Sequence, residues 1–296
     1  MLTKNNVNIL DILRCPICHN ERLRHINNNL ECTKCKNLFD IYDNIPIVID
    51  KNYSIFISEN IRNNNWEDYD SAKKTIRPAK YSEQKQSILE KLAPSYRVQV
   101  GPTYKDFIRE NSISGKILEL GGGPSSLHIE GVVNLDINSY KDVDIIGDAR
   151  NIPFKTASFD AIISNSVLEH IYETDRVIDE CDRVLKKGGY IFMCVPQVCG
   201  RHHKIDYHRW TIPGLKKMFD GYDVVDKGIV LGPGMFIGHL AASLFRSLTP
   251  FKLLNKIVCL LVEWLMFPFR FMDLIGKEKY EDNAHTIYVI VKKRKA

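Results

Sequence analysis

The stretch that decides the fold is K-I-L-E-L-G-G-G-P-S-S-L-H-I-E-G-V-V-N-L-D, residues 116–136. It holds two short apolar runs, the first ending in three glycines and the second ending in Asp136. Short apolar runs bounded by glycine are typical of buried parallel strands. Two such strands joined by one crossover form the first half of a nucleotide-binding α/β unit. A carboxylate at the end of the second strand accepts hydrogen bonds from ribose hydroxyls, so we expect Asp136 to bind a ribose.

The glycines differ from those of the dinucleotide-binding fingerprint. Residues 121–123 are glycines, but Pro124 and two serines follow, so the third glycine of G-x-G-x-x-G is missing. Glu119, two residues before the first glycine, suits a cationic ligand and repels a pyrophosphate. These residues favour a sulfonium nucleoside over NAD. The alternative is a tight turn that binds no ligand.

Beyond residue 136, apolar runs and helical patterns alternate. We expect further strands over residues 143–147, 159–164, 189–195, 222–230 and 285–291, and a helix over 173–185. Such alternation predicts an α/β fold, with a parallel sheet that carries helices on both faces. The ligand of such a sheet lies at the carboxyl ends of its strands.

Five motifs in this region resemble those of class I S-adenosylmethionine-dependent methyltransferases, in order and spacing, over residues 98–230. They are E-L-G-G-G, N-L-D, G-D-A-R-N-I-P-F, S-F-D-A-I-I-S-N-S-V-L-E-H and V-L-K-K-G-G-Y. The resemblance implies a Rossmann-like sheet with an antiparallel last strand, and S-adenosylmethionine as cofactor. It implies that the methionine end of the cofactor meets Glu119, Gly121 and Gly123, the ribose Asp136, the adenine Asp148 and Ala149, and the sulfonium Ser164 and Asn165. The chain departs from the family at Ser125, where a third glycine is usual, and in its very short first crossover, residues 124–131.

Two C-x-x-C pairs near the start of the chain predict a metal site formed by Cys15, Cys18, Cys32 and Cys35. Zn²⁺ prefers four soft ligands in a tetrahedron, and a full set of thiolates without an open position is typical of a structural site. The alternative is two pairs of free thiols. Residues 39–48 look like a strand that closes this module. Together with L-R-C-P-I-C and the closing I-P-I-V, the pairs resemble the zinc-ribbon family related to the tRNA-methyltransferase activator, over residues 9–50.

The loop after the fifth expected strand carries the candidate catalytic residues, in V-P-Q-V-C-G-R-H-H-K-I-D-Y-H-R-W, residues 195–210. Methyl transfer needs a base only if the acceptor has a proton that must leave. The candidates are His203, Asp206, His208 and Arg209. A histidine suits a base near neutral pH, and Arg209 suits a carboxylate or a phosphate. The alternative is a polar turn in which Arg209 pairs with Asp206.

The chain of 296 residues has room for a zinc ribbon at 1–50, a linker with a helical lead-in at 51–95, and a methyltransferase domain at 96–296. In the linker, Tyr69, Lys80 and Tyr81 are candidates for covering the ligand. The mild net charge of +5 does not by itself indicate an anionic partner. Residues 1–13 lack the apolar core of a signal peptide, so we expect the eight cysteines to be thiols or metal ligands in the cytoplasm.

Residues 231–284 form a hydrophobic insertion before the last expected strand. Its second apolar run is interrupted by Glu263, Pro268, Arg270 and Asp273, which argues against a transmembrane helix. Three interpretations compete: a lid over the acceptor, a homodimer surface, or a helix in a membrane interface that makes the protein peripheral to a membrane.

The function predicted from these features is transfer of a methyl group from S-adenosylmethionine to a small-molecule or glycan acceptor. D-Y-H-R-W-T at 206–211 and G-P-G at 232–234 loosely resemble type 11 methyltransferases linked to polysaccharide biosynthesis. One alternative is methylation of tRNA or rRNA, suggested by the ribbon and the basic tail at 292–295. The other is a catalytically silent methyltransferase fold that acts as a binding module.

Overall fold

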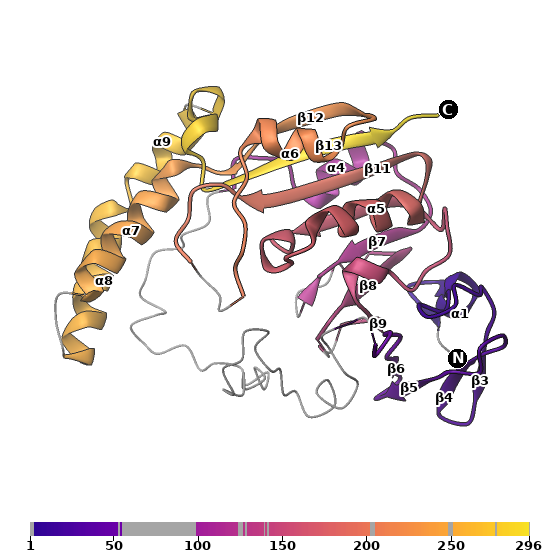
Figure 1. Cartoon of the computed structure of the whole chain (residues 1–296). Helices are drawn as coiled ribbons and strands as arrows, with labels where there is room; N and C mark the ends of the chain where they lie inside the picture. Colours follow the sequence, from indigo (N-terminus) through magenta and orange to yellow (C-terminus); the bar gives the residue numbers. More distant parts are fainter. Residues whose placement is uncertain are drawn as a thin grey trace.

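A computed structural model of the chain describes residues 3–52, 54, 99–123, 127, 129–138, 140, 142–201, 205–247, 251–275 and 277–295. Its main element is a seven-stranded sheet with the strand order β12-β13-β11-β10-β7-β8-β9 (Figure 1). The strands are β7 Ile117–Leu120, β8 Val132–Asp136, β9 Ile145–Ile146, β10 Phe159–Asn165, β11 Leu185–Pro196, β12 Tyr222–Leu231 and β13 Thr286–Lys293. The predicted linker and helical lead-in, with Tyr69, Lys80 and Tyr81, lies almost entirely outside the described residues.

Strands β7 to β11 pair in parallel, whereas β13 runs antiparallel to both of its neighbours. This topology confirms the predicted Rossmann-like sheet with an antiparallel last strand. Strand β11 begins four residues before the expected start at residue 189. Its pairing with β10 shifts register, Phe159 lying opposite Leu185 but Ala161 opposite Tyr190. Gly188, with φ +76°, allows that irregularity because a residue without Cβ adopts positive φ at little cost.

Alternate residues of the strands feed two cores. Leu118 of β7 packs in one core with the helix α5, Thr174–Val184, and the helix α6, Ile212–Met218. Ile117, its neighbour, packs in the other core with Phe107 of the helix α4, Tyr104–Glu110. Every residue of β7 is buried, as expected for a parallel strand covered by helices on both faces.

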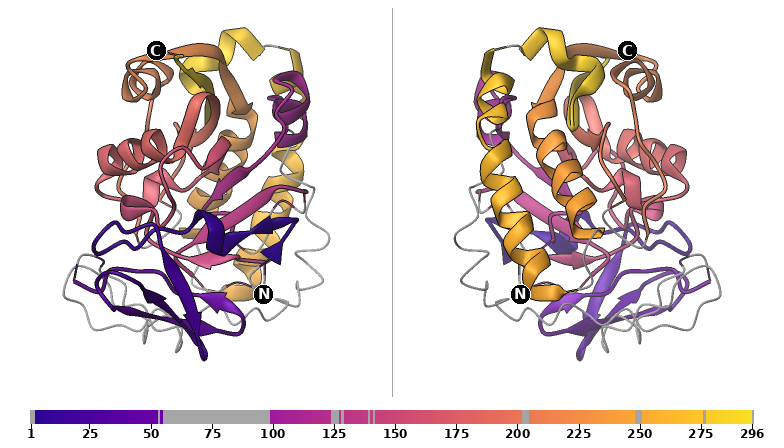
Figure 2. Two further views of the ribbon diagram at one scale, coloured as in Figure 1. Left: turned by 90° about the vertical axis from the view of Figure 1, so that its right-hand side faces the viewer. Right: turned by 90° about the vertical axis from the view of Figure 1, so that its left-hand side faces the viewer.

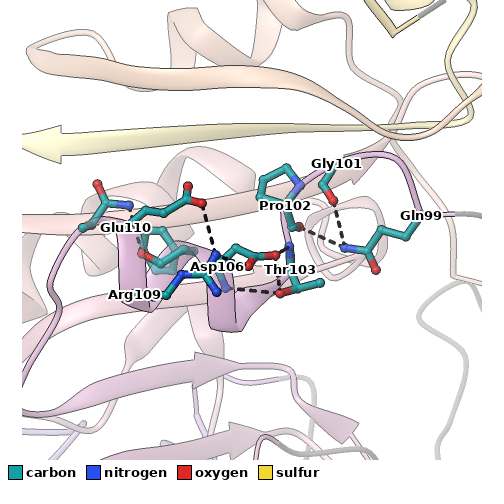
Figure 3. A network of polar contacts seen from close by, with 9 residues as sticks. Gln99, Gly101, Pro102, Thr103, Asp106, Arg109 and Glu110 are labelled. Atoms are coloured by element: carbon teal, nitrogen blue, oxygen red, sulfur yellow. Dashed lines mark hydrogen bonds and ion pairs between the residues drawn. The ribbon is translucent and has the colours of Figure 1, made fainter. Parts of the chain in front are cut away.

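Helix α4 begins with a capping box, which Figure 3 shows from close by. The Thr103 hydroxyl accepts a hydrogen bond from the Asp106 backbone N–H, and the Asp106 carboxylate accepts one from the Thr103 N–H. The Gln99 side chain donates to the carbonyl of Pro102 just before the helix (Figure 3). This network fixes residues 99–103, of which Gln99 forms an antiparallel bridge with Leu231 at the end of β12.

The N-terminal module is a four-stranded antiparallel sheet of β3 Leu23–Ile26, β4 Asn29–Cys32, β5 Leu38–Tyr42 and β6 Ile45–Pro46. A short hairpin, β1 Thr3–Lys4 and β2 Val7–Asn8, and a helix, α1 Ile9–Ile12, precede it. The expectation of a single closing strand over residues 39–48 is wrong. Asp43 and Asn44 both have positive φ, 50° and 63°, so the chain folds back there into the hairpin of β5 and β6.

The ribbon packs against the edge of the main sheet. Ile47 forms a parallel bridge with Ile146 of β9, and the Val48 N–H donates to the Ile146 carbonyl at 2.9 Å. Leu13, fully buried, bridges Phe154 and belongs to the same core as the α5 face of the sheet. The ribbon therefore covers the edge strand β9 and shares a core with the larger domain.

The insertion folds into helices α7 Pro233–Ser247, α8 Lys252–Met266 and α9 Phe269–Ile275, followed by the 3₁₀ segment η4 Lys277–Asn283. Helices α7 and α8 run side by side along one flank of the molecule (Figures 1 and 2). The buried carboxylate of Asp273 accepts a hydrogen bond from the Gly234 N–H at 2.9 Å and so ties α9 to the start of α7. Within the described residues, no helix combines the length and apolar character needed to cross a bilayer.

Candidate cofactor and acceptor site

The glycine turn after β7 is clasped by Asp136 at the end of β8. The Gly123 N–H donates to Asp136 Oδ2 at 3.0 Å, and the Asn138 N–H donates to Oδ1 at 2.7 Å. Burial raises the pKa of Asp136, against these hydrogen bonds, which favour its charged form. Oδ1 also accepts a hydrogen bond from the Asn138 side-chain amide at 3.3 Å, so the acceptor capacity left for a ribose hydroxyl lies on Oδ2.

At two of the three glycines, neighbouring atoms leave no room for a Cβ atom. Gly121 has φ +71°, and a Cβ there would lie 2.4 Å from Cγ2 of Val167. A Cβ on Gly122 would lie 2.6 Å from Cδ of Glu119 and 2.8 Å from Oδ1 of Asn134. Gly122 and Asn134 are not among the predicted site residues. In the sequence, only the run of three glycines points to Gly122 as a site residue, and nothing points to Asn134.

Glu119 lies next to this turn, and its contact with the methionine end of the cofactor stays a prediction. Its carboxylate is buried and accepts a hydrogen bond from the Leu127 N–H at 2.9 Å. The register of the sheet places it beside Asn134 of β8. Oδ1 of Asn134 is buried and has no hydrogen-bond donor among the described residues. A polar atom buried in this way fits a site that completes its hydrogen bonds with a ligand or a water.

The carboxylate of Asp148 is hydrogen-bonded to other side chains of the protein. Its carboxylate accepts hydrogen bonds from the Arg150 guanidinium, at 2.8 and 3.1 Å, and from the Ser54 hydroxyl at 2.7 Å. Burial opposes the charge, but the Arg150 hydrogen bonds and charge prevail and lower the pKa of Asp148. Asp148 therefore shapes the turn of residues 149–151, with half-buried Ala149 as its first residue. The adenine contact implied by the resemblance stays a prediction.

Ser164 and Asn165 end β10 at the same edge of the sheet. The Ser164 side chain is buried, and its hydroxyl has no hydrogen-bond partner among the described residues. Asn165 is exposed and lines a cavity of about 1100 Å³ with Glu169, Arg201 and His285. The cavity lies beside the strand ends, where an acceptor would approach the cofactor.

The loop after β11 is fastened to the segment after β10. The Tyr207 N–H donates to the Glu169 carbonyl at 2.7 Å, and His208 Nε2 donates to the Tyr172 carbonyl at 3.1 Å. His208 also lies among the rings of Tyr172, Tyr207 and Trp210. His203 lies outside the described residues.

Arg209 holds this loop together. Its guanidinium forms a two-pronged ion pair with Asp206, whose side chain is only 1% exposed. Its remaining N–H groups donate to the carbonyls of Cys199, Gly200 and His208. All five guanidinium donors are thus directed at the loop itself. This arrangement favours the alternative in which Arg209 pairs with Asp206. Cys199, Gly200 and Arg201 of the loop line the cavity, whereas Asp206, His208 and Arg209 do not.

Glu169 is a buried carboxylate that the sequence reasoning missed. Burial raises its pKa to about 7, and the charge of nearby Arg209 only partly opposes this. The residue belongs to the lining of the cavity, but its side chain has no exposed surface, and Nε2 of His170 lies 3.8 Å from its carboxylate. The L-E-H motif was visible in the sequence, but nothing in it distinguished a buried carboxylate from a helical surface residue.

The four cysteines of the ribbon converge. Their Sγ atoms all lie within 4.8 Å of one another, with Cys15 and Cys35 3.7 Å apart and Cys18 and Cys32 3.5 Å apart. The two knuckles repeat one conformation, since His19 and Lys36 follow them with φ 59° and 62°.

Asparagine side chains surround this cluster. The Asn20 amide donates to the sulfur of Cys32 at 3.6 Å, and the Asn37 amide donates to that of Cys35 at 3.2 Å. Hydrogen bonds of this kind stabilise thiolates and fix the ligands of a metal. The donor set fits the predicted structural Zn²⁺ site, with four sulfur ligands and no open position.

Comparison with known proteins gives a match between residues 130–193 and the methyltransferase domain family. A demethylmenaquinone methyltransferase of Streptomyces avermitilis is 40% identical over 48 residues, 16% of this chain and 21% of that protein. A probable S-adenosylmethionine-dependent methyltransferase of Mycolicibacterium smegmatis is 34% identical over 58 residues, 19% of this chain and 23% of that protein. The chain thus spans about a fifth of the length of these curated relatives.

Among solved structures, the chain is similar to a Haemonchus contortus phosphoethanolamine N-methyltransferase 2 in complex with S-adenosyl-L-methionine. The TM-score is 0.40 and the identity 16%, over 66% of this chain and 50% of that one. The sequence matches support S-adenosylmethionine as the cofactor. Residues 130–193 therefore match a methyltransferase domain, the class of domain that the motifs predict.

Proposed function

We propose that the whole chain is a cytoplasmic S-adenosylmethionine-dependent methyltransferase whose acceptor is a small molecule or a glycan. The observation that carries the proposal is the clasp between Asp136 and the glycine turn inside a domain that matches the methyltransferase family. The buried Glu119 suits a cationic ligand next to that turn.

S-adenosylmethionine, when bound, supplies an electrophilic methyl group on a sulfonium. The contribution of the chain is to hold the acceptor in line with that methyl group and to exclude water. Ser164 has a buried hydroxyl at the strand end, and Asn165 presents an amide to the cavity. We propose that these two side chains orient the reacting groups. His208 is the candidate base if the acceptor must lose a proton, because its Nδ1 is an acceptor when Nε2 donates.

RNA as the acceptor has less support. The ribbon and the basic tail suggested it, but two of the four basic residues of the tail form ion pairs within the domain: Lys293 pairs with Asp182, and Arg294 pairs with Asp223. Retention of RNA that falls steeply with salt would favour the RNA alternative. A silent binding module has less support too, since a domain without a cofactor has no use for the Asp136 clasp and the buried Glu119 together.

The test is calorimetric titration of S-adenosylmethionine into the zinc-loaded chain and into the variants Asp136→Ala and Asp223→Ala. Asp223 is an exposed carboxylate remote from the glycine turn, so its variant is the matched control. We expect the wild type and the control to bind and Asp136→Ala to bind at least about tenfold more weakly. Circular dichroism checks that each variant is folded. A folded wild type that does not bind, or equal binding by all three proteins, would refute the proposal.

A further inference from the structure

Helix α8 exposes an apolar face along its whole length. Leu254, Ile257, Leu261, Trp264 and Leu265 are between 40% and 68% exposed, and their spacing places them on one side of the helix. The face that packs inward is apolar as well, with Cys259 and Val262 buried. A helix in a water-soluble domain normally has one apolar face. The packed face of α8 suffices to hold the helix on the domain, so the exposed apolar face has no role within the fold.

The neighbouring helices add to this surface. Three exposed side chains of α7 (Ile237, Leu240 and Leu244) and three of α9 (Phe269, Phe271 and Leu274) are each about half exposed. With those of α8 they expose on the order of 1,000 Å² of apolar area, judged from the size of such side chains. The largest apolar patch of a typical monomer is about 300–600 Å². A partner is therefore needed to cover these helices.

Charge on the insertion favours an anionic lipid surface as that partner. Between residues 233 and 275 the sequence has Arg246, Lys252, Lys256 and Arg270, against two carboxylates. Of these carboxylates, Asp273 is buried and caps α7, and Glu263 is half-buried. On α8 the positions of Lys252, Lys256 and Glu263 share one side, next to that of the buried Cys259 and away from the exposed apolar face. A basic polar side opposite a Trp- and Leu-rich side is typical of helices that lie in a membrane interface.

The cavity also argues for lipid over a second copy of the chain. Phe236 and Leu240 of α7 line the cavity of about 1100 Å³, so the apolar surface of the insertion continues into it. A second copy packed on these helices would cover that side of the cavity, whereas a membrane would supply amphipathic molecules to it. Helices α7 and α8, of 15 residues each, are about 22 Å long and too short to span a bilayer core of about 30 Å.

We propose that helices α7–α9 lie in the surface of an anionic membrane and hold the mouth of the cavity against it. The Asp273 cap on α7 fixes the helices to the domain, and the His285 N–H donates to the Leu231 carbonyl at 2.9 Å at the base of the insertion. Contact with lipid therefore orients the whole domain. This inference does not depend on methyl transfer, and its test needs no cofactor.

The experiment is flotation of the full chain with vesicles of equal parts phosphatidylcholine and phosphatidylglycerol. The variant Leu261→Glu/Leu265→Glu places two charges on the exposed face of α8. The control, Leu38→Glu/Val225→Glu, places two charges at exposed apolar positions of the ribbon and of β12. We expect the wild type and the control to float with the vesicles and the α8 variant to bind at least about tenfold more weakly.

Gel filtration and circular dichroism of all three proteins show whether each is folded and whether it self-associates. The proposal is overturned if the wild type stays in solution. A dimer abolished by the α8 variant would then identify a second copy as the partner, and a monomer would mean that the chain covers these helices itself. Equal binding of vesicles by the wild type and the α8 variant would also overturn it.

Discussion

Replacing Glu169 with Gln should make the folded chain more stable at neutral and alkaline pH. Burial raises the pKa of Glu169 from its ordinary 4.5 to about 7, because the charged form of a side chain with no exposed surface is poorly solvated. The folded state therefore holds the proton more tightly than the unfolded state does. The contribution of this group to stability is fully present below pH 4.5 and is lost as pH rises toward 7.

The size of the effect follows from the two pKa values. The difference between 4.5 and about 7 corresponds to about 3 kcal/mol of lost stability once the group is ionised in both states. Gln has nearly the same shape and does not ionise. The variant should therefore match the wild type near pH 4 and be about 3 kcal/mol more stable near pH 8.

Urea unfolding of the zinc-loaded wild type and Glu169→Gln variant, at several pH values between these two, gives the stability of each protein as a function of pH. The exposed Glu110→Gln variant is the control and should follow the wild type at every pH. Parallel curves for Glu169→Gln and the wild type would refute the reasoning. They would mean that a partner of the carboxylate compensates its charge in the folded state.

Two further predictions concern the glycine turn and the ribbon. Gly122→Ala should weaken S-adenosylmethionine binding at least tenfold and cost about 1–3 kcal/mol of stability, because its Cβ would lie 2.6 Å from the Glu119 side chain. Gly200→Ala, where a Cβ meets nothing within 4 Å, should change neither the cofactor binding nor the stability. Calorimetric titration measures the binding of both variants, and thermal unfolding measures their stability. Cys18→Ser should lose most of the bound zinc and lower the melting temperature, whereas Cys199→Ser, outside the ribbon, should keep both. Zinc content by atomic absorption that is equal in the two variants would contradict the four-cysteine site.

The sheet could be predicted because its central strands are short and mostly apolar. Residues 117–120 and 132–136 are buried throughout, so their composition alone marks them as central strands. The two cysteine pairs were equally clear, since few structures other than a metal site use that spacing. The hairpin at Asp43 and Asn44 was missed because apolar residues lie on both sides of this pair, and the positive φ of the two residues is known only from the structure.

The candidate site was less accessible to sequence reasoning, because its residues are used differently from what their types suggest. Arg209 has the chemistry of a phosphate ligand, but only the folded loop reveals that its donors reach three carbonyls and Asp206. Glu169 differs from a surface carboxylate only by burial, which depends on distant segments. The exposed face of α8 could not be told from its packed face, since both are apolar.

The bridge between Ile47 and Ile146 makes the solubility of the protein depend on whether the ribbon has bound zinc. Strand β9 is the outermost strand on its side of the sheet, and the segment that covers it is the end of the zinc module. An uncovered strand edge is a template for pairing with other chains. During synthesis the ribbon emerges before the main sheet, so a chain made with zinc has this cover folded before its sheet is complete. Zinc-starved cells should therefore accumulate the protein as aggregates rather than as an inactive soluble form.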